Sequence, residues 1–107
     1  MALIRRLPGM KDGTPQELKL RTTVQDFLRD HLLSHKYRAI DTPLLEPTDL
    51  FLRKSGGELA ARMYTFTDPG GNKVSLRPEF TSSVIRYYIE RADTESLPVK
   101  LQYAGPV

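Results

Sequence analysis

The 107-residue chain lacks cysteine and tryptophan, and it contains no long hydrophobic run. Without cysteine it has no disulfide, no thiolate ligand for a metal ion and no cysteine nucleophile. A membrane-spanning helix needs about 18 or more consecutive apolar residues, and no such run is present. The basic pair Arg5-Arg6 follows too soon after the first residue for a secretory signal peptide. We therefore expect a cytoplasmic protein that does not enter a membrane.

Several patterns that mark enzymes are absent as well. The sequence has no GxxxxGK[ST] phosphate-binding loop, no GxGxxG motif and no His/Asp/Glu cluster at metal-ligand spacing. Ser34 and His35 are adjacent, but they lie at the expected end of a helix and do not indicate a serine triad. What remains, with 39% hydrophobic and 27% charged residues, is typical of soluble globular proteins. The net charge of +3 is a mild basic excess, compatible with an anionic partner.

The clearest local signal is a helix start at Thr14-Pro15-Gln16-Glu17. Thr14 is expected to cap the helix, Pro15 suits its first position, and Glu17 would complete a capping box. The helix is predicted to run to about Ser34. Its apolar stripe recurs at helical spacing and consists of Leu20, Val24, Phe27, Leu28 and Leu32.

Short elements are predicted after this helix. Residues 37–42 form a strand that Pro43 ends, because proline has no N–H for a sheet ladder. A helical turn opens at residues 47–49, and a surface loop containing Gly56-Gly57 is expected at residues 54–61.

The second half of the chain is predicted to contain a hairpin, a helix and a strand. The turn at residues 68–72 joins strands at 63–67 and 73–77, and a loop this short makes them antiparallel. A helix at 81–91 with an inward apolar face and a strand at 99–103 follow. The inward positions are Val84, Ile85, Tyr88 and Ile89. This order predicts an α+β fold with a mainly antiparallel sheet.

The segment from Leu76 to Thr81 lies between a predicted strand and a predicted helix, where free helical N–H groups and side chains face a ligand. The carboxylate of Glu79 and the hydroxyl of Thr81 together would suit the α-ammonium group of an amino acid. The local pattern by itself favours a structural interpretation, in which Thr81 caps the helix and Glu79 or Glu90 lies on its surface. The local pattern leaves both interpretations open.

Arginines and aromatic residues near this segment also have two interpretations. Arg86 could brace the sheet or bind an anion, but isolated arginines such as Arg77 and Arg86 more often form surface ion pairs. The aromatic residues could form a stacking platform for single-stranded nucleic acid, although aromatic residues at these spacings more often form a core. They are Tyr64, Phe66, Tyr87, Tyr88 and Tyr103.

Taken in order, these motifs resemble the start of a class II aminoacyl-tRNA synthetase, and most closely the histidyl-tRNA synthetase family. Residues 6–15 resemble that family's N-terminal opening. The first helix and residues 37–46 resemble class II motif 1, with Pro43 at the position of its proline. Residues 63–81 resemble the family's MYTF…LRPE-x-T hairpin.

The resemblance implies an α+β catalytic domain that activates histidine with ATP and transfers it to tRNA(His). It implies that Glu79 and Thr81, with Phe80 between them, bind the α-amino group of histidine. It further implies a homodimer whose interface includes motif 1 with Tyr37 and Pro43, and ATP accompanied by Mg²⁺. Adenylation of this kind is accelerated by positioning and by cations that stabilise charge on the phosphate.

Phe80 departs from the pattern of many bacterial members, which carry glycine there. In having a bulky residue at this position, the sequence resembles the family's paralogue, which regulates ATP phosphoribosyltransferase in histidine biosynthesis and does not charge tRNA. The intact Met63-Tyr64-Thr65-Phe66 run and Glu79 favour the synthetase.

In the family, residues 103–107 would lead into motif 2, whose arginine binds the ATP α-phosphate, and motif 3 follows later. We therefore expect residues 1–107 to be the N-terminal part of a larger catalytic domain. The chain alone is expected to lack full catalysis, because those phosphate-binding residues are not in it.

Overall fold

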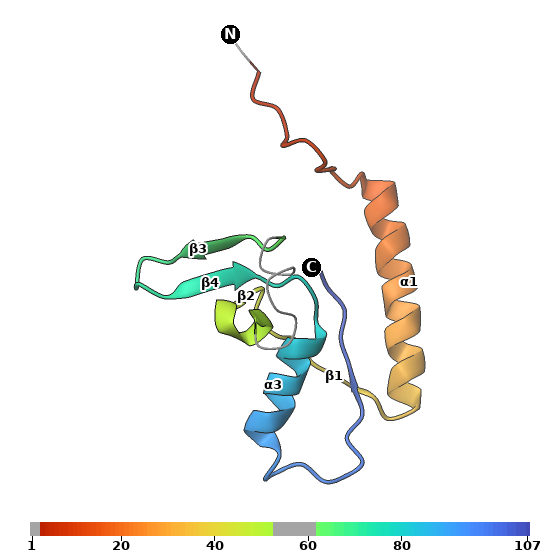
Figure 1. Cartoon of the computed structure of the whole chain (residues 1–107). Helices are drawn as coiled ribbons and strands as arrows, with labels where there is room; N and C mark the ends of the chain where they lie inside the picture. Colours follow the sequence, from red (N-terminus) through yellow and green to blue (C-terminus); the bar gives the residue numbers. More distant parts are fainter. Residues whose placement is uncertain (1–2, 53–61) are drawn as a thin grey trace.

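The computed structural model describes residues 3–52 and 62–107, and the predicted loop at residues 54–61 lies outside the described residues. The elements run in the order α1 (Pro15–Ser34), β1 (Arg38–Ala39), β2 (Leu45–Pro47), β3 (Thr65–Thr67), β4 (Lys73–Leu76), α3 (Thr81–Arg91) and β5 (Leu101–Gln102). A helical turn follows β2 at residues 48–52. In Figure 1, α1 stands to one side of the hairpin and α3. The α+β class is confirmed.

The start of α1 follows its sequence signal. The Oγ1 atom of Thr14 accepts a hydrogen bond from the N–H of Glu17 at 3.2 Å, and Pro15 occupies the first turn, where no N–H partner is needed. The carboxylate of Glu17 pairs with Lys11 at 3.0 Å instead of completing the predicted capping box. The predicted cap is therefore confirmed for Thr14.

The end of α1 is a left-handed turn. Lys36 has a φ of 68°, and its N–H donates to Leu33 O while that of Tyr37 donates to Leu32 O. These two bonds satisfy carbonyl groups of the last helical turn. The helix therefore ends at the predicted residue without a glycine.

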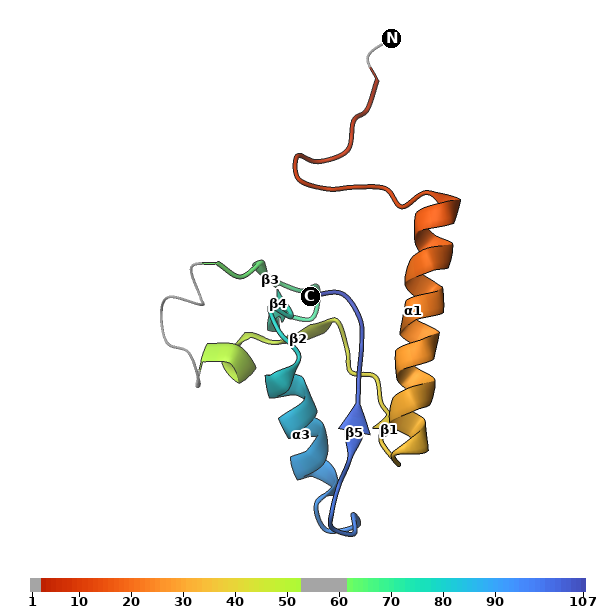
Figure 2. The ribbon, with the colours of Figure 1, turned by 90° about the vertical axis from the view of Figure 1, so that its right-hand side faces the viewer.

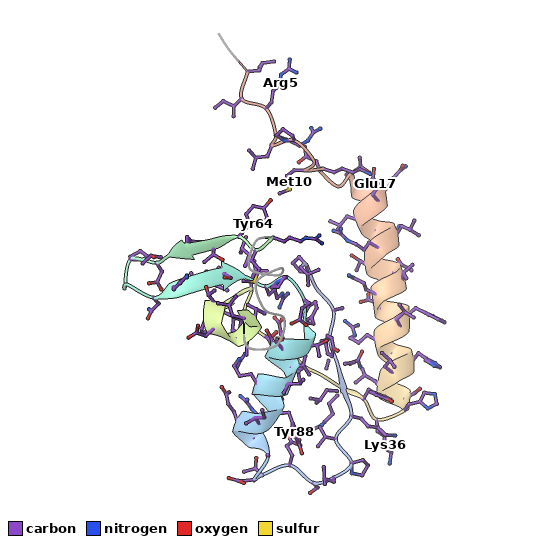
Figure 3. All side chains as sticks on the ribbon, viewed as in Figure 1. Arg5, Met10, Glu17, Lys36, Tyr64 and Tyr88 are labelled. Carbon is purple, nitrogen blue, oxygen red and sulfur yellow. The ribbon has the colours of Figure 1, made fainter. Side chains whose placement is uncertain are left out.

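The predicted apolar stripe of α1 lies at the surface. Leu20 is 67% exposed and Phe27 is 72% exposed, and no residue of α1 is buried. Side chains project along the whole length between the labelled Glu17 and Lys36 (Figure 3). Periodicity correctly identifies an apolar face, but no described segment covers most of that face.

Three strands form an antiparallel sheet in the order β2-β4-β3. Leu45 is paired with Leu76 across β2 and β4, and Thr65 with Ser75 across β3 and β4. The predicted hairpin is confirmed, although its strands are shorter than the expected 63–67 and 73–77. One further bond, from the N–H of Arg77 to Leu44 O, continues the pairing of β4 with β2, and the proline that follows Arg77 has no N–H to extend it.

The hairpin turn is organised by Asp68. Its carboxylate accepts hydrogen bonds from the backbone N–H of Asn72 at 2.8 Å and from the side chain of Asn72 at 3.2 Å. These bonds, the backbone one foremost, lower the pKa of Asp68 from its ordinary value. Gly71 has a φ of 86°, a conformation that favours glycine.

Buried hydroxyl groups link the sheet to the helical turn after β2. Ser75, which is fully buried, forms hydrogen bonds with Thr48 Oγ1 at 2.8 Å and with Thr65 Oγ1 at 2.9 Å. Phe51, on the helical turn, is also fully buried.

β1 and β5 form a separate parallel pair, in which Arg38 lies opposite Leu101 and Ala39 opposite Gln102. Figure 2 shows this pair between α1 and α3. The side-chain amide of Gln102 donates to Arg29 O at 3.2 Å and to Tyr37 O at 2.9 Å, which ties α1 to the pair. Both strands are shorter than the predicted 37–42 and 99–103. Two further backbone bonds extend the ladder, from Arg38 N–H to Lys100 O and from Ile40 N–H to Gln102 O.

The described residues do not enclose a conventional core. Phe51 is the one buried hydrophobic residue among them, and the radius of gyration is 17.5 Å, against about 13 Å for a compact chain of this length. The predicted inward face of α3 is only partly covered, since Ile85 is 47% and Ile89 is 66% exposed. No helix in the described ranges is long and apolar enough to cross a membrane.

Candidate functional site

The segment at residues 77–81 joins the end of β4 to the start of α3 (Figure 1). The carboxylate of Glu79 accepts a hydrogen bond from the backbone N–H of Ser82, with Oε1 at 3.3 Å and Oε2 at 3.2 Å. Glu79 is half-buried and Thr81 is exposed. The carboxylate is therefore held at the start of the helix, where the helix dipole favours a negative charge.

This geometry corrects the structural interpretation of Thr81. Thr81 is the first residue of α3, and Phe80 occupies the capping position without a side-chain hydrogen bond. The side chain that satisfies a free helical N–H is Glu79. A carboxylate accepts several hydrogen bonds at once, so this contact is compatible with binding an ammonium group.

Phe80 lies in a stack of three side chains. Its ring is 4.1 Å from the guanidinium carbon of Arg77 and 5.1 Å, centroid to centroid, from the ring of Tyr103. The ring of Phe80, the residue between the two candidate ligands, therefore packs against Arg77 and Tyr103.

Arg77 does not form the surface ion pair that an isolated arginine in the sequence indicated. It is 4% exposed and its partners are oxygen atoms of the backbone and of a hydroxyl group. Its Nε donates to Pro106 O at 2.8 Å, and one terminal nitrogen donates to Thr42 O at 2.9 Å and Thr42 Oγ1 at 3.3 Å. No ion pair of Arg77 is found within residues 3–52 and 62–107.

Arg86 does brace the sheet, as one of its two interpretations predicted. Its Nε donates to Glu46 on β2 at 2.9 Å, and its Nη1 donates to Glu90 on α3 at 3.2 Å. Glu46 is 5% exposed. Burial by itself would lower the pKa of Arg86, but hydrogen bonds and charges from Glu46 and Glu90 outweigh burial and raise it above its ordinary value.

The aromatic residues form neither the expected core nor a common surface. Tyr64 is 70% exposed and Phe66 is 47% exposed, because no described segment covers the outer face of β3. Tyr87 packs beneath Arg91, with the guanidinium carbon 4.0 Å from the ring centroid. Tyr88 lies on α3, away from Tyr64 near the hairpin (Figure 3). The aromatic residues are therefore too scattered to support a nucleic-acid stacking platform.

The two motif 1 residues lie at different distances from this segment. Pro43 is exposed and directly follows Thr42, the residue that contacts Arg77, so it lies beside the candidate site. Tyr37 lies at the foot of α1, where its ring is 5.5 Å from the ammonium group of Lys100. The structure brings Pro43 but not Tyr37 to the Glu79 segment.

Comparisons with known proteins identify this arrangement. The sequence model described as "Histidyl-tRNA synthetase" matches residues 9–107. The chain belongs to the histidyl-tRNA synthetase family. A histidine–tRNA ligase from Haloarcula marismortui is 39% identical over 92 residues, which cover 86% of this chain and 21% of that protein. This chain thus spans about a fifth of the length of that family member.

Solved histidyl-tRNA synthetase structures have the same fold. The apo enzyme of Staphylococcus aureus is 34% identical, with a TM-score of 0.83 over 98% of this chain and 25% of that one. A Bacillus halodurans structure titled as an ATP phosphoribosyltransferase regulatory subunit/histidyl-tRNA synthetase has a TM-score of 0.76 over 98% of this chain and 28% of that one. At 22% identity, that second likeness shows the fold alone.

Sequence reasoning missed three participants in the site, namely Thr42, Tyr103 and Gly105. A Cβ atom added at Gly105 would lie 2.8 Å from Nη2 of Arg77 and 3.2 Å from Cζ of Phe80. Nothing local in the sequence indicates that the backbone of residues 105 and 106 approaches a residue almost 30 positions earlier.

Proposed function

We propose that this chain carries the amino-acid-binding segment of a histidine–tRNA ligase, which activates histidine with ATP and transfers it to tRNA(His). The match to the family over residues 9–107 carries the proposal. The relative at 39% identity is named histidine–tRNA ligase, whereas the structure whose title names a regulatory subunit is 22% identical. The regulatory alternative suggested by Phe80 therefore has less support. The proposed site of action is the cytoplasm.

In this proposal, Glu79 and Thr81 bind the α-ammonium group of histidine. Glu79 contributes a charged acceptor that is already oriented by Ser82, and Thr81 contributes an exposed hydroxyl at the first residue of α3. Phe80 supports the two ligands from between them by packing on Arg77. Holding the amino group fixes where the α-carboxylate lies, and this is the group that attacks the ATP α-phosphate.

The described residues supply no group of three His, Cys, Asp or Glu side chains that could hold a metal ion. Mg²⁺ in nucleotide sites needs no such group, because it binds mainly to the substrate phosphates and to water. We assign Mg²⁺ to ATP as its counter-ion and derive no step through it.

We also propose a homodimer in which α1 and the motif 1 segment contact the partner. The exposed apolar stripe of α1 supports this, since contiguous apolar surface of this kind marks interaction sites. Changing Phe27 to Glu should convert a dimer to monomers in analytical ultracentrifugation. A dimer of unchanged stability would place the interface elsewhere.

The proposed activity is tested on the protein encoded by the complete reading frame that contains this chain, which we call the gene product. It should catalyse histidine-dependent pyrophosphate exchange and charge tRNA(His). Glu79→Gln keeps an acceptor for the Ser82 N–H but removes the negative charge. A charge-assisted hydrogen bond contributes about 1.5–3 kcal/mol, so the KM for histidine should rise about tenfold to a hundredfold.

Asp93→Asn is the matched control, because Asp93 is an exposed carboxylate just beyond α3. It should leave the KM for histidine unchanged. An unchanged KM in Glu79→Gln would reject the role of Glu79. Absence of exchange in a folded wild type that instead stimulates an ATP phosphoribosyltransferase catalytic subunit would support the regulatory alternative.

A further inference from the structure

We propose that Arg77 is a positioning residue, which holds residues 79–81 in the geometry that an amino-acid ligand needs. This inference rests on the proposed function of that segment. Arg77 does not itself serve as a ligand in the proposal; it acts through Phe80 and through the backbone around it.

The first support is the number of segments that meet at this one side chain. Its guanidinium bonds to Thr42, which follows β1, and to Pro106, which follows β5. Its own backbone N–H donates to Leu44 O at 3.0 Å. Arg77 therefore joins the motif 1 segment, the β4–α3 connection and the residues after β5.

The second support is the chemistry of the contacts. A buried charge is destabilising unless its hydrogen bonds are satisfied, and Arg77 meets this condition with carbonyl and hydroxyl oxygens. The planar guanidinium fork reaches oxygens of two separate segments at the same time, which a lysine ammonium on a flexible stem does not do. The geometry of this residue is therefore as important as its charge.

The third support is the stack. The Phe80 ring lies 4.1 Å from the guanidinium carbon, and the carbonyl of Phe80 accepts the N–H of Val84 at 3.0 Å in the first turn of α3. Because Phe80 separates Glu79 from Thr81, fixing its ring and its carbonyl fixes the relation of the two proposed ligands. Gly105 makes this packing possible, since a Cβ there would meet both Arg77 and Phe80.

The main experiment compares Arg77→Lys with Arg91→Lys in the gene product. Both arginines stack on an aromatic ring, but Arg91 is exposed and lies over Tyr87. We expect Arg77→Lys to raise the KM for histidine about tenfold or more in pyrophosphate exchange while the KM for ATP stays within twofold, and Arg91→Lys to change neither. A role only in folding would reduce the active fraction and leave the KM for histidine within twofold, and that result would overturn the proposal.

A second experiment uses glycine substitutions. Gly105→Ala should raise the KM for histidine as Arg77→Lys does, whereas Gly13→Ala should have no effect, because a Cβ at Gly13 meets nothing within 4 Å. A lysine at position 77 lacks the terminal guanidinium nitrogen, Nη2, that the new methyl group at residue 105 would meet. Gly105→Ala should therefore have a smaller effect in the Arg77→Lys background than in the wild type. Fully independent effects would contradict the proposed contact.

Amide hydrogen exchange separates this proposal from the proposed function. If the wild type does not catalyse histidine-dependent pyrophosphate exchange, the proposed function fails. Whether or not the wild type is active in that assay, Arg77→Lys should accelerate hydrogen exchange of the Ser82 and Val84 amides about tenfold relative to Arg91→Lys. Unchanged protection of these amides would overturn the positioning role.

Discussion

α1 and the sheet with the base of α3 are stabilised in different ways. α1 is set by local signals at its two ends, and most of its large apolar side chains remain exposed. The sheet and α3 are joined by buried polar contacts between residues far apart in sequence, including Glu46 with Arg86 and Thr48 with Ser75. Among the described residues, long-range order therefore depends more on hydrogen bonds than on apolar packing. Substitutions in the two regions should therefore have effects of different size.

The largest effect is expected for Glu46→Ala. This change leaves the part-buried guanidinium of Arg86 without its contact to β2, and loss of a hydrogen bond to a charged group costs about 1.5–3 kcal/mol. The urea midpoint of the gene product should fall accordingly.

Glu90→Ala is the control, because it removes an exposed partner from the same arginine. Exposed pairs four residues apart on a helix contribute only about 0.3–0.5 kcal/mol. Equal effects of the two substitutions would contradict the difference between buried and exposed contacts.

A smaller effect is expected for Ser75→Ala, which removes the hydroxyl between Thr48 and Thr65. Buried groups left without a partner cost about 1–3 kcal/mol. Ser83 is equally buried, but its hydroxyl has no partner in the described part of the chain. Ser83→Ala should therefore be neutral or slightly stabilising in the same unfolding measurement. A loss as large as that of Ser75→Ala would show that the hydroxyl network is not what stabilises the sheet.

The smallest effect is expected in α1. Thr14→Ala removes the side-chain cap and should cost about 1 kcal/mol, because water can replace the lost bond at this exposed end. Circular dichroism during thermal unfolding measures it, with Thr22→Ala, in the exposed middle of the helix, as the control. A cost above that of Glu46→Ala would reverse the comparison of the two regions.

The sequence predicts those parts of the fold that have local causes. Thr14 and Pro15 define the start of α1, and Asp68 to Asn72 define the hairpin turn, because the stabilising contacts lie within four residues. The parallel pairing of β1 with β5 has no local signature, since its partners are 63 residues apart. Periodicity identified the apolar faces of α1 and α3 but could not indicate what covers them.

The candidate site divides in the same way. Glu79 and Thr81 could be selected by residue type and by their place between a strand and a helix. The environment of Arg77 could not be predicted, because its oxygen partners come from Thr42 and Pro106, which lie 35 and 29 residues away. An isolated arginine in a sequence most often indicates a surface ion pair, and only the tertiary structure shows that this one is buried.

The contact of Gln102 between α1 and β5 requires a hydrogen-bond donor toward both of its partners. Both of its partners, Arg29 O and Tyr37 O, are carbonyl oxygens, so the amide must present its nitrogen to both. Glutamate has nearly the same shape but would place an oxygen opposite two oxygens. Exchange of this single atom, by mutation or by slow deamidation, would turn the bond that holds the helix beside the strand into a repulsion.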